Sequence, residues 1–510
     1  MLNKSSSRFR ALDAAEPFDV CIIGSGFAGT VIGKSLAERG IRTVIIESGE
    51  SLSRWLFNTR IRTLAKHEVS GDTDYPLTRT HARAVGGTSN FWTGRSERLH
   101  PLDFEKNSYT PEGVFWPITY AEIEPYYQQA EETLRVRGGA LSSYHAPRKN
   151  KLPLPPTTDI SSLKSILAEV GVTVDDSPTA TPAKGWRFFR VQKEILPDFL
   201  ASPHALLVSG LTVTRLISNG DGRIIGAQAA NLRGDSRIVR ARCYVVACGG
   251  IESPRLLLLS RSKTFPNGIG NGHDRVGRGF NEHPGVNFYG SIRHRWSTIY
   301  PRHKIGRSHQ FYDQFKHEGL GGVHPVFIQS WVLLHHQMRF KISNLPQNVL
   351  SILGRMRRAL LHIGATVEMP PCDSNRVTLS ENAKDCFGNP VAHLSFSYTE
   401  DDRKTLDRTR ALIRQIYHSL DATDVKEADL TWSCHHIGTC RMGDNPKTSV
   451  VDRNLRVHES PNLHVCGSEV FVTGGGLQPV LTITALAHRL ADHLASQFSR
   501  TATGTVVCKQ

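Results

Sequence analysis

One pair of histidines stands in a setting that could perform acid–base chemistry. Cys434, His435 and His436 lead into the string IGTCRMG at 437–443. The pKa of an imidazole lies near neutral pH, so His435 could accept a hydroxyl proton, although spacing alone equally allows a structural residue in a tight turn. Cys434, His435, His436 and Cys440 lack a familiar zinc spacing, so no metal is expected. Gln478 stands immediately before Pro479, and its amide can hold a hydroxyl group but cannot be a base.

A glycine-rich turn between two apolar runs predicts a dinucleotide-binding unit. Phe18–Ile23 is expected to be a buried strand, and Gly24, Gly26 and Gly29 follow as a GxGxxG. A helical pattern comes next, and then an apolar strand, Thr43–Ile46, that ends at Glu47. In such a unit the glycines allow the tight turn, the approach of a pyrophosphate and close helix packing, while the acid accepts from ribose hydroxyls. The motif alone leaves both NAD and FAD open.

The rest of the chain alternates strand-like and helical segments. Apolar spacing predicts helices over 120–135 and 401–420 and a final helix that opens at Pro479. Short β-like runs occupy 205–239 and 367–397, and Tyr244–Cys248 predicts a buried strand. Ser253 and Pro254 predict a helix start, with Ser253 as its N-cap. The Pro- and Ser-rich stretch 141–159 predicts an exposed loop, and either it or 51–80 could gate a site.

Composition bounds the class of protein. The chain has 510 residues, of which 39% are apolar and 21% charged, which excludes a disordered chain, a coiled coil and a collagen-like fibre. The net charge of +15 is scattered, which favours a solvated basic surface over nucleic-acid binding. The nine cysteines form no CxxC pair, and Met1–Pro17 is polar. Together with the absence of an 18-residue apolar stretch, these features predict a cytoplasmic protein without a membrane span.

Seven strings, in order along the chain, resemble the glucose–methanol–choline (GMC) family of FAD-dependent oxidoreductases. They are the N-terminal fingerprint, VGGTSNFW (85–92), VVACGGIESPRLLL (245–258), VGRGFNEHP (276–284) with NRVTLS (375–380), HHIGTCRMG (435–443) and the terminal GGGLQPVLTITALAHRLADHL. Within the family, the form HHxGTxRMG is most similar to the bacterial branch around pyranose oxidase and C-glycoside 3-oxidases.

The resemblance implies a fold of α/β plus α+β class. A Rossmann-like FAD-binding domain would be assembled from 1–98, 197–283 and 434–510. A discontinuous substrate-binding domain, built on an antiparallel sheet, would be assembled from 99–196 and 284–433.

The resemblance also implies the site. His435 matches the catalytic histidine, and Gln478 stands where relatives carry Asn or His. The cofactor-binding residues would be Gly24, Gly26, Gly29, Glu47, Gly86, Gly87, Thr88, Asn90, Val213, Cys248, Gly467, Ser468 and Pro479. Phe91 occupies the position of the histidine that links FAD covalently in some members, so non-covalent FAD is expected.

The implied function is oxidation of a primary or secondary alcohol of a sugar, glycoside or other polyol, with FAD as hydride acceptor. Oxygen, a quinone or a carrier protein would be the electron acceptor. Because Gln478 departs from the family pattern, a lyase, a light-driven enzyme or a non-redox flavoprotein stays open, as does NAD dependence. Polar and aromatic side chains at His324, Gln329, Trp331, His335 and His336 could face a sugar or could be ordinary packing.

Overall fold

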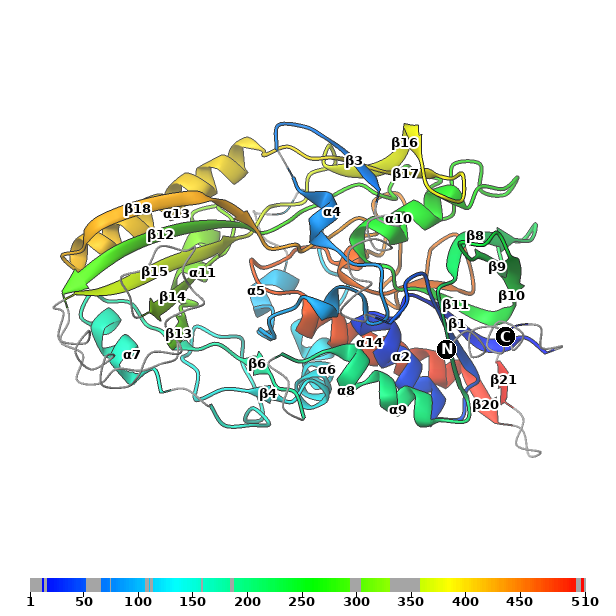
Figure 1. Ribbon diagram of the computed structural model, residues 1–510, viewed down its shortest axis with the longest axis horizontal. Coiled ribbons are helices and arrows are strands. Elements are labelled where there is room, and N and C mark those ends of the chain that lie inside the picture. Colours follow the sequence, from blue (N-terminus) through cyan, green and yellow to red (C-terminus); the bar gives the residue numbers. More distant parts are fainter. Residues whose placement is uncertain are drawn as a thin grey trace.

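The structure is a computed structural model that describes residues 12, 16–51, 66–73, 75–105, 110, 113–156, 159–183, 188–293, 304–330, 358–500 and 506–508. Figure 1 shows an elongated molecule with a parallel sheet and its helices towards one end of the long axis and a large antiparallel sheet at the other. Among the described residues, no helix combines the length and apolarity needed to cross a bilayer.

The parallel sheet has five strands. Their order is β19 (Leu463–Val465), β11 (Ala241–Val246), β1 (Phe18–Ile23), β2 (Thr43–Glu47) and β7 (Ala205–Ser209), and every neighbouring pair is parallel. All residues of β1 and β2 are buried, as expected for a sheet covered on both faces. This confirms the predicted Rossmann-like unit.

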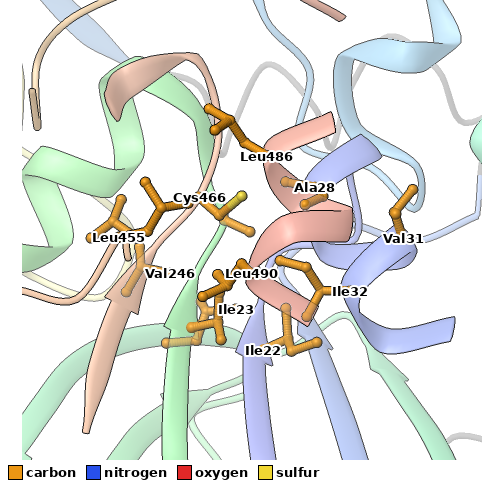
Figure 2. Close-up of a cluster of buried hydrophobic side chains, with 14 of the residues drawn as sticks. Ile22, Ile23, Ala28, Val31, Ile32, Val246, Leu455, Cys466, Leu486 and Leu490 are labelled. Carbon is orange, nitrogen blue, oxygen red and sulfur yellow. The ribbon is translucent and has the colours of Figure 1, made fainter. Parts of the chain in front are cut away.

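Two helices from opposite ends of the chain pack together on this sheet. Helix α2 (Phe27–Glu38) and the last helix, α14 (Val480–Gln497), interleave their apolar side chains over β1. Figure 2 shows Leu490 of α14 beside Ile32 of α2 and Ile23 of β1. The helical spacing of apolar residues predicted the buried stripe of α14. That this stripe packs against α2 is seen only in the tertiary structure.

Helix α6 (Tyr120–Thr133) lies against the other side of α14. It begins with a capping box in which Thr119 and Glu122 satisfy each other's backbone amides. The Tyr127 hydroxyl lies 2.8 Å from Thr482 Oγ1 of α14. A segment expected in the substrate-binding domain therefore packs on an element of the FAD-binding domain, and the domain division stays a proposal.

The antiparallel sheet has six strands. Their order is β18 (Thr423–Trp432), β12 (Pro284–Arg293), β15 (Arg358–Val367), β14 (Val323–Ser330), β13 (Lys304–Arg307) and β5 (Asp175–Asp176). All neighbouring pairs are antiparallel. This confirms the expected second sheet, which draws its strands from 175 to 432.

The two faces of this sheet differ in chemistry. One face carries apolar side chains such as Phe288, Phe327 and Ile363, which join a core with α11 (Gln310–His317) and α13 (Glu400–Ser419). Residues one position along each strand point the other way. By this register the opposite face carries Asn287, Arg307, His324, His362 and Thr366.

One expected helix start is wrong. Helix α10 covers Gly249–Leu259 with Cys248 as its N-cap, so Ser253 and Pro254 lie inside the helix. Pro254 has no N–H for the carbonyl of Gly250, and the Thr439 hydroxyl donates to that carbonyl instead at 2.8 Å. The helix continues through the proline because another loop supplies the missing donor.

The remaining elements are short or lie at the edges. They are β3 (His67–Ser70), α4 (Leu77–Thr80), η2 (Gly87–Asn90), α5 (Pro101–Phe104), β4 (Val136–Arg137), α7 (Ser161–Ala168), β6 (Thr179–Ala180), α8 (Val191–Glu194), α9 (Leu196–Ala201), β8 (Thr212–Ser218), β9 (Ile224–Ala230), β10 (Ser236–Val239), β16 (Arg376–Lys384), β17 (Pro390–Ser395), η5 (Ser468–Val470), β20 (Phe498–Arg500) and β21 (Val506–Cys508). Strand β3 joins β17 and β16 in a small sheet, so the segment after the dinucleotide unit reaches the C-terminal half.

Candidate active site

Predicted cofactor residues gather at the carboxyl ends of four adjacent parallel strands. Gly24 follows β1, Glu47 ends β2, Cys248 follows β11 and Gly467 follows β19. Ligands of open parallel sheets bind in the crevice at this edge. The four residues come from distant parts of the sequence, and the parallel pairing brings them together.

The three fingerprint glycines do different work. At Gly24 (φ +104°) a Cβ would collide with the carbonyl of Ala247, and at Gly29 it would collide with the carbonyl of Gly24. At Gly26, the N-cap of α2, a Cβ would meet nothing within 4 Å. Gly24 and Gly29 are therefore needed for packing, whereas Gly26 borders open space at a helix N-terminus. That arrangement fits a dinucleotide pyrophosphate.

The Gly-Gly loop docks on the fingerprint turn. Gly86 (φ +86°) donates its amide to Ser25 Oγ at 3.0 Å, and Gly87 (φ +53°) lies beside Gly26. Asn90 Nδ2 closes the loop by donating to the carbonyls of Val85 and Gly87 at 3.1 and 2.8 Å. Thr88 accepts the amide of Ala82 at 3.3 Å. Gly86, Gly87 and Asn90 thus shape one wall of the crevice.

Glu47 is held at the end of β2 by the same turn. Its carboxylate accepts from the Ser25 amide and hydroxyl at 3.0 and 2.7 Å and from the Gly49 amide at 2.8 Å. Burial raises the pKa of Glu47, and these hydrogen bonds oppose that rise. The carboxylate is therefore positioned at the strand end, as the fingerprint requires.

The other predicted cofactor residues lie in β8, in η5 and at the start of α14. Val213 lies in β8, just after Leu211, whose amide donates to the Glu47 carbonyl at 3.0 Å. The Ser468 hydroxyl donates to the His436 carbonyl at 2.7 Å, which ties the end of β19 to the histidine segment. Pro479 is the N-cap of α14.

His435 forms a pair with a second histidine, His283. Their Nδ1 atoms lie 2.9 Å apart, and His283 is fully buried while His435 is partly exposed. The buried carboxylate of Glu282 accepts the amides of His283, Cys434 and His435 at 2.8–2.9 Å and the Tyr75 hydroxyl at 2.9 Å. One carboxylate therefore fixes the backbone of both histidines.

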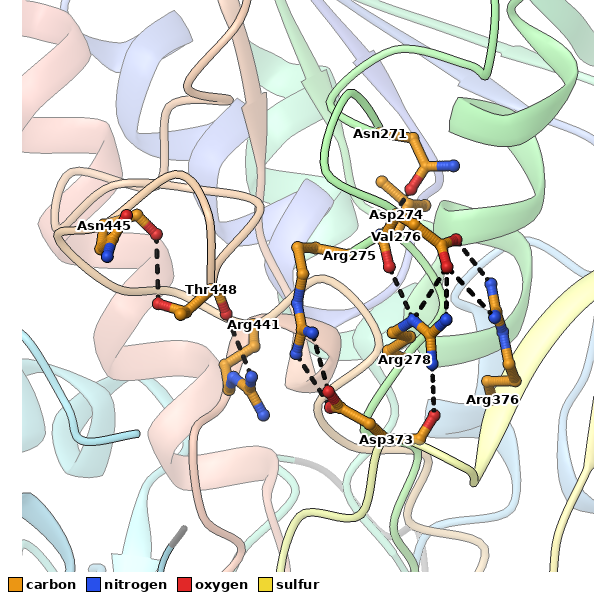
Figure 3. Close-up of polar contacts among 10 residues, drawn as sticks. All are labelled: Asn271, Asp274, Arg275, Val276, Arg278, Asp373, Arg376, Arg441, Asn445 and Thr448. Atoms are coloured by element: carbon orange, nitrogen blue, oxygen red, sulfur yellow. Dashed lines mark hydrogen bonds and ion pairs between the residues drawn. The ribbon is translucent and has the colours of Figure 1, made fainter. Parts of the chain in front are cut away.

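The loops that carry the two histidines are joined along their length. Asn281 and Ile437 exchange both backbone hydrogen bonds at 3.1 Å, and Gly277 donates to Thr439 at 2.7 Å. Further along, Arg275 pairs with Asp373 through two bonds of 2.7 and 2.8 Å. Figure 3 shows this contact beside the pairing of Asp274 with Arg278 and Arg376. The network anchors the strings VGRGFNEHP and HHIGTCRMG to β16.

The two imidazoles are neutral at ordinary pH. Burial lowers the pKa of His435 well below 6.5, and His283, His436 and Arg307 lower it further. Burial lowers the pKa of His283 to about 3. A neutral His435 can accept a proton, which is the state a general base requires.

The loop before α14 is held from the antiparallel sheet. Glu368 accepts the Gly475 amide at 3.0 Å, His324 Nε2 lies 2.9 Å from the Gly475 carbonyl, and Thr366 donates to the Gly476 carbonyl at 2.8 Å. Gly474 packs directly on the His283 ring. His283 therefore lies between His435 and this loop, which leads to Gln478. The partly buried Gln478 has no hydrogen-bond partner for its Oε1 among the described residues.

Sequence reasoning missed the partners of His435. Glu282 and His283 stand in the quoted string VGRGFNEHP, and their Glu-His pair was an available signal, whereas nothing in the sequence pointed to Tyr75. Of the possible sugar-facing residues, His324 holds the Gly475 loop, and Gln329 shares its face with Phe327 in the core. Trp331, His335 and His336 lie outside the described residues.

The histidine–cysteine segment does not gather as a metal site. The His436 ring instead bonds Tyr75 and Thr80 at 3.0 and 2.9 Å. In the described part of the chain, one group has ligand-like spacing, His67, His81 and Glu252. Glu252 is already paired with Arg83 at 2.5 Å and with Arg255 at 3.2 Å. The group is therefore an ion-paired cluster, and the expectation of no metal stays a prediction.

The glycine turns and Glu47 have the arrangement of a dinucleotide-binding unit. Comparison with known proteins identifies the family. The model of an FAD binding domain matches residues 17–56, and two models of GMC oxidoreductases match 183–285 and 371–487. The chain belongs to the FAD-dependent GMC oxidoreductases.

Curated relatives span nearly the whole chain. It is 29% identical to paromamine 6'-oxidase of Streptomyces fradiae, covering 94% of this chain and 91% of that protein. It is 24% identical to the fructose dehydrogenase large subunit of Gluconobacter japonicus, covering 94% and 98%. A C-glycoside 3-oxidase of Microbacterium trichothecenolyticum is 25% identical over 85% of this chain and 79% of its own.

A solved structure confirms the fold. Pyridoxine 4-oxidase from Mesorbium loti superposes with a TM-score of 0.64 at 17% identity, covering 93% of this chain and 99% of that one. The Rossmann-like domain with a second, antiparallel sheet is therefore the fold of this protein.

Proposed function

We propose that this enzyme oxidises a secondary or primary alcohol of a sugar, glycoside or other polyol to a carbonyl, with His435 as the base. The observation that supports it most strongly is the His435–His283 pair beside the crevice that fits FAD. The names of two relatives, which mention fructose and a C-glycoside, support a sugar-like substrate. Bound FAD supplies the hydride acceptor of the reaction.

His435 takes the hydroxyl proton of the substrate. In the tautomer that fits this role, His435 donates through Nδ1 to His283 Nδ1 and keeps Nε2 free to accept. His283 Nε2 has no hydrogen-bond partner among the described residues, so no contact there fixes its protonation. We assign the ring proton of His283 to Nε2, because this leaves Nδ1 as the acceptor that the tautomer of His435 needs.

Two further groups position the reaction. Glu282 fixes the backbone of both histidines, so the His435 ring is oriented before the substrate arrives. Gln478 holds the substrate hydroxyl through its amide, which has a free Oε1. We also propose the division into an FAD-binding domain (1–98, 197–283, 434–510) and a substrate-binding domain (99–196, 284–433).

Replacing His435 tests the proposal. In His435→Gln the anaerobic reduction of bound FAD by a panel of polyols should slow by about 10²- to 10⁴-fold, the usual contribution of a general base. FAD absorbance should be retained. His204→Gln, an exposed histidine beyond α9, is the matched control and should reduce FAD at the parental rate.

The pH profile gives a second test. Because a base works above its pKa and that of His435 is lowered well below 6.5, the reduction rate should stay level as pH falls from 8 to 6.5. Failure of every polyol to reduce the FAD would instead favour the lyase, light-driven or non-redox alternatives. An unchanged rate in His435→Gln would refute the role of His435.

A further inference from the structure

Arg307 is a fully buried arginine with almost no partners. It ends β13 and is 0% exposed, yet none of its three guanidinium nitrogens has a hydrogen-bond partner among the described residues. Its single ion pair is a long one, 3.4 Å from Nε to Glu97 Oε1. Buried guanidinium groups are normally paired and hydrogen-bonded, because an unpaired buried charge is costly.

The surrounding charges do not balance. Burial and then the charge of Arg307 lower the pKa of Arg95, and Glu97 is the carboxylate that acts on both arginines. Glu97 Oε1 is also bonded to the Ser177 hydroxyl at 2.6 Å. Asp175, opposite Arg307 on β5, engages Ser142, His145 and Lys164. Two guanidinium groups thus share one carboxylate.

The nearby histidines and lysine do not change this balance. Burial lowers the pKa of His309 and His324 well below 6.5, so both rings are neutral. Lys316 is paired with Glu368 at 2.6 Å, and Arg148 is paired with Glu131 at 3.1 Å. Segments 294–303 and 331–357, which flank β13 and β14 in the sequence, contain no Asp or Glu. They hold no carboxylate that could neutralise Arg307.

Arg307 lies on the face of the sheet that meets the active site. It pairs with Val326, two residues from His324, so Arg307 and His324 share a face. His324 contacts the Gly475–Gly476 loop, and Gly474 of the same loop packs on His283. The charge of Arg307 acts on both His283 and His435. The unpaired guanidinium group therefore borders the place of the reaction.

We infer that Arg307 is a specificity residue that binds an oxyanion group of the substrate, a carboxylate or a phosphate, so that the preferred substrate is an acidic polyol. This rests on the proposed alcohol oxidation at His435. The planar fork of an arginine matches two oxygens of such a group, and the pairing is strongest where water is excluded. A bound oxyanion would supply both the missing hydrogen-bond acceptors and the missing negative charge.

Matched substrates with and without an acidic group test the inference without any variant. Anaerobic reduction of the holoenzyme is measured with methyl glucuronide and its methyl ester, with gluconate and glucitol, and with glucose 6-phosphate and glucose. At least one acid should be preferred over its neutral partner by about 10- to 100-fold in kcat/KM, as expected for a hydrogen-bonded buried charge. The carboxylate and phosphate pairs show which oxyanion is bound.

Variants then assign the preference to Arg307. Arg307→Met should reduce kcat/KM for the preferred acid by about 10- to 100-fold and leave the neutral partner within about twofold. Arg307→Lys keeps the charge and should recover part of the loss. Arg414→Gln, an exposed arginine on α13, is the control and should not change the preference. Binding can also be measured without turnover. Acetate or inorganic phosphate should change the FAD absorbance of the parent enzyme, and Arg307→Met should abolish this change.

The outcomes separate the two proposals. Equal rates with acids and neutral partners in the parent enzyme would overturn the role of Arg307 and leave alcohol oxidation standing. Because this comparison uses only the parent enzyme, it tests the role of Arg307 even if Arg307→Met fails to fold. An unchanged acid preference in Arg307→Lys and Arg307→Met would also overturn it. If acetate or phosphate binds through Arg307 but no polyol reduces the FAD, the proposed oxidation fails instead.

Discussion

The two large sheets of this enzyme differ in whether their buried charged groups have hydrogen-bond partners. The parallel sheet is covered on both faces, and Glu47 at its carboxyl edge is satisfied by backbone and hydroxyl donors. The antiparallel sheet has one apolar face and one polar face, and Arg307 on the polar face is left unsatisfied. This difference supports the proposal that the first sheet binds a resident cofactor and the second a replaceable ligand.

Removing apolar volume from the second sheet should have the largest effect on stability. Phe327 is 0% exposed on the apolar face, so Phe327→Ala should lower the free energy of unfolding by about 3–5 kcal/mol. The urea midpoint of the holoenzyme measures it. Asn287→Ala, on the polar face of the same sheet, should cost about 1–2 kcal/mol, because it removes three hydrogen bonds, to Gly285, Thr431 and His362, that water can replace in part. Equal losses would contradict the contrast between the two faces.

Filling the open space at Gly26 should separate cofactor binding from folding. Gly26→Ala adds a methyl group that meets no protein atom, so the fold should persist. The affinity for FAD should fall by about 10- to 100-fold, since the methyl group occupies the expected pyrophosphate site. The FAD affinity is measured from the amount of FAD that stays bound per protein as the holoenzyme is diluted. Gly220→Ala, in an open surface turn, is the control, and unchanged FAD affinity in Gly26→Ala would place the pyrophosphate elsewhere.

A buried carboxylate at the parallel sheet should give a smaller, pH-dependent effect. Burial raises the pKa of Glu469 to about 7 from the ordinary 4.5. Between these values the unfolded state is charged while the folded state is protonated, so the folded state loses stability as pH rises from 4.5 to about 7. A pKa shift of this size corresponds to a loss of about 3 kcal/mol at pH 8. Glu469→Gln removes that loss but weakens the hydrogen bond from the Ser253 hydroxyl, so the free energy of unfolding should rise by about 1–2 kcal/mol.

Thermal unfolding of the parent and of Glu469→Gln at two pH values tests whether the substitution raises the free energy of unfolding. The two proteins should differ at pH 8 and converge as pH approaches 4.5, where both states of the parent are protonated. A variant that is less stable than the parent at pH 8 would mean that the Glu469 carboxylate is stabilised by its partner Ser253 rather than destabilised by burial.

Much of the first sheet could be predicted because its signals are local. The glycines, the apolar strands and Glu47 lie within one short stretch, and their spacing alone predicts the strand–helix–strand unit. The start of α10 was misplaced because the donor that allows Pro254 inside the helix, Thr439, comes from a distant loop. The pairing of β3 with β17 has no local signal for the same reason.

The sequence by itself determined the dinucleotide unit, the final amphipathic helix and, through the family strings, His435 and its class of chemistry. Only the tertiary structure decided that Glu282 and His283 hold His435, and that Arg307 faces them with too few partners. The physical reason is that a local pattern records which face of an element is buried, whereas the balance of charges in a site depends on side chains from many elements.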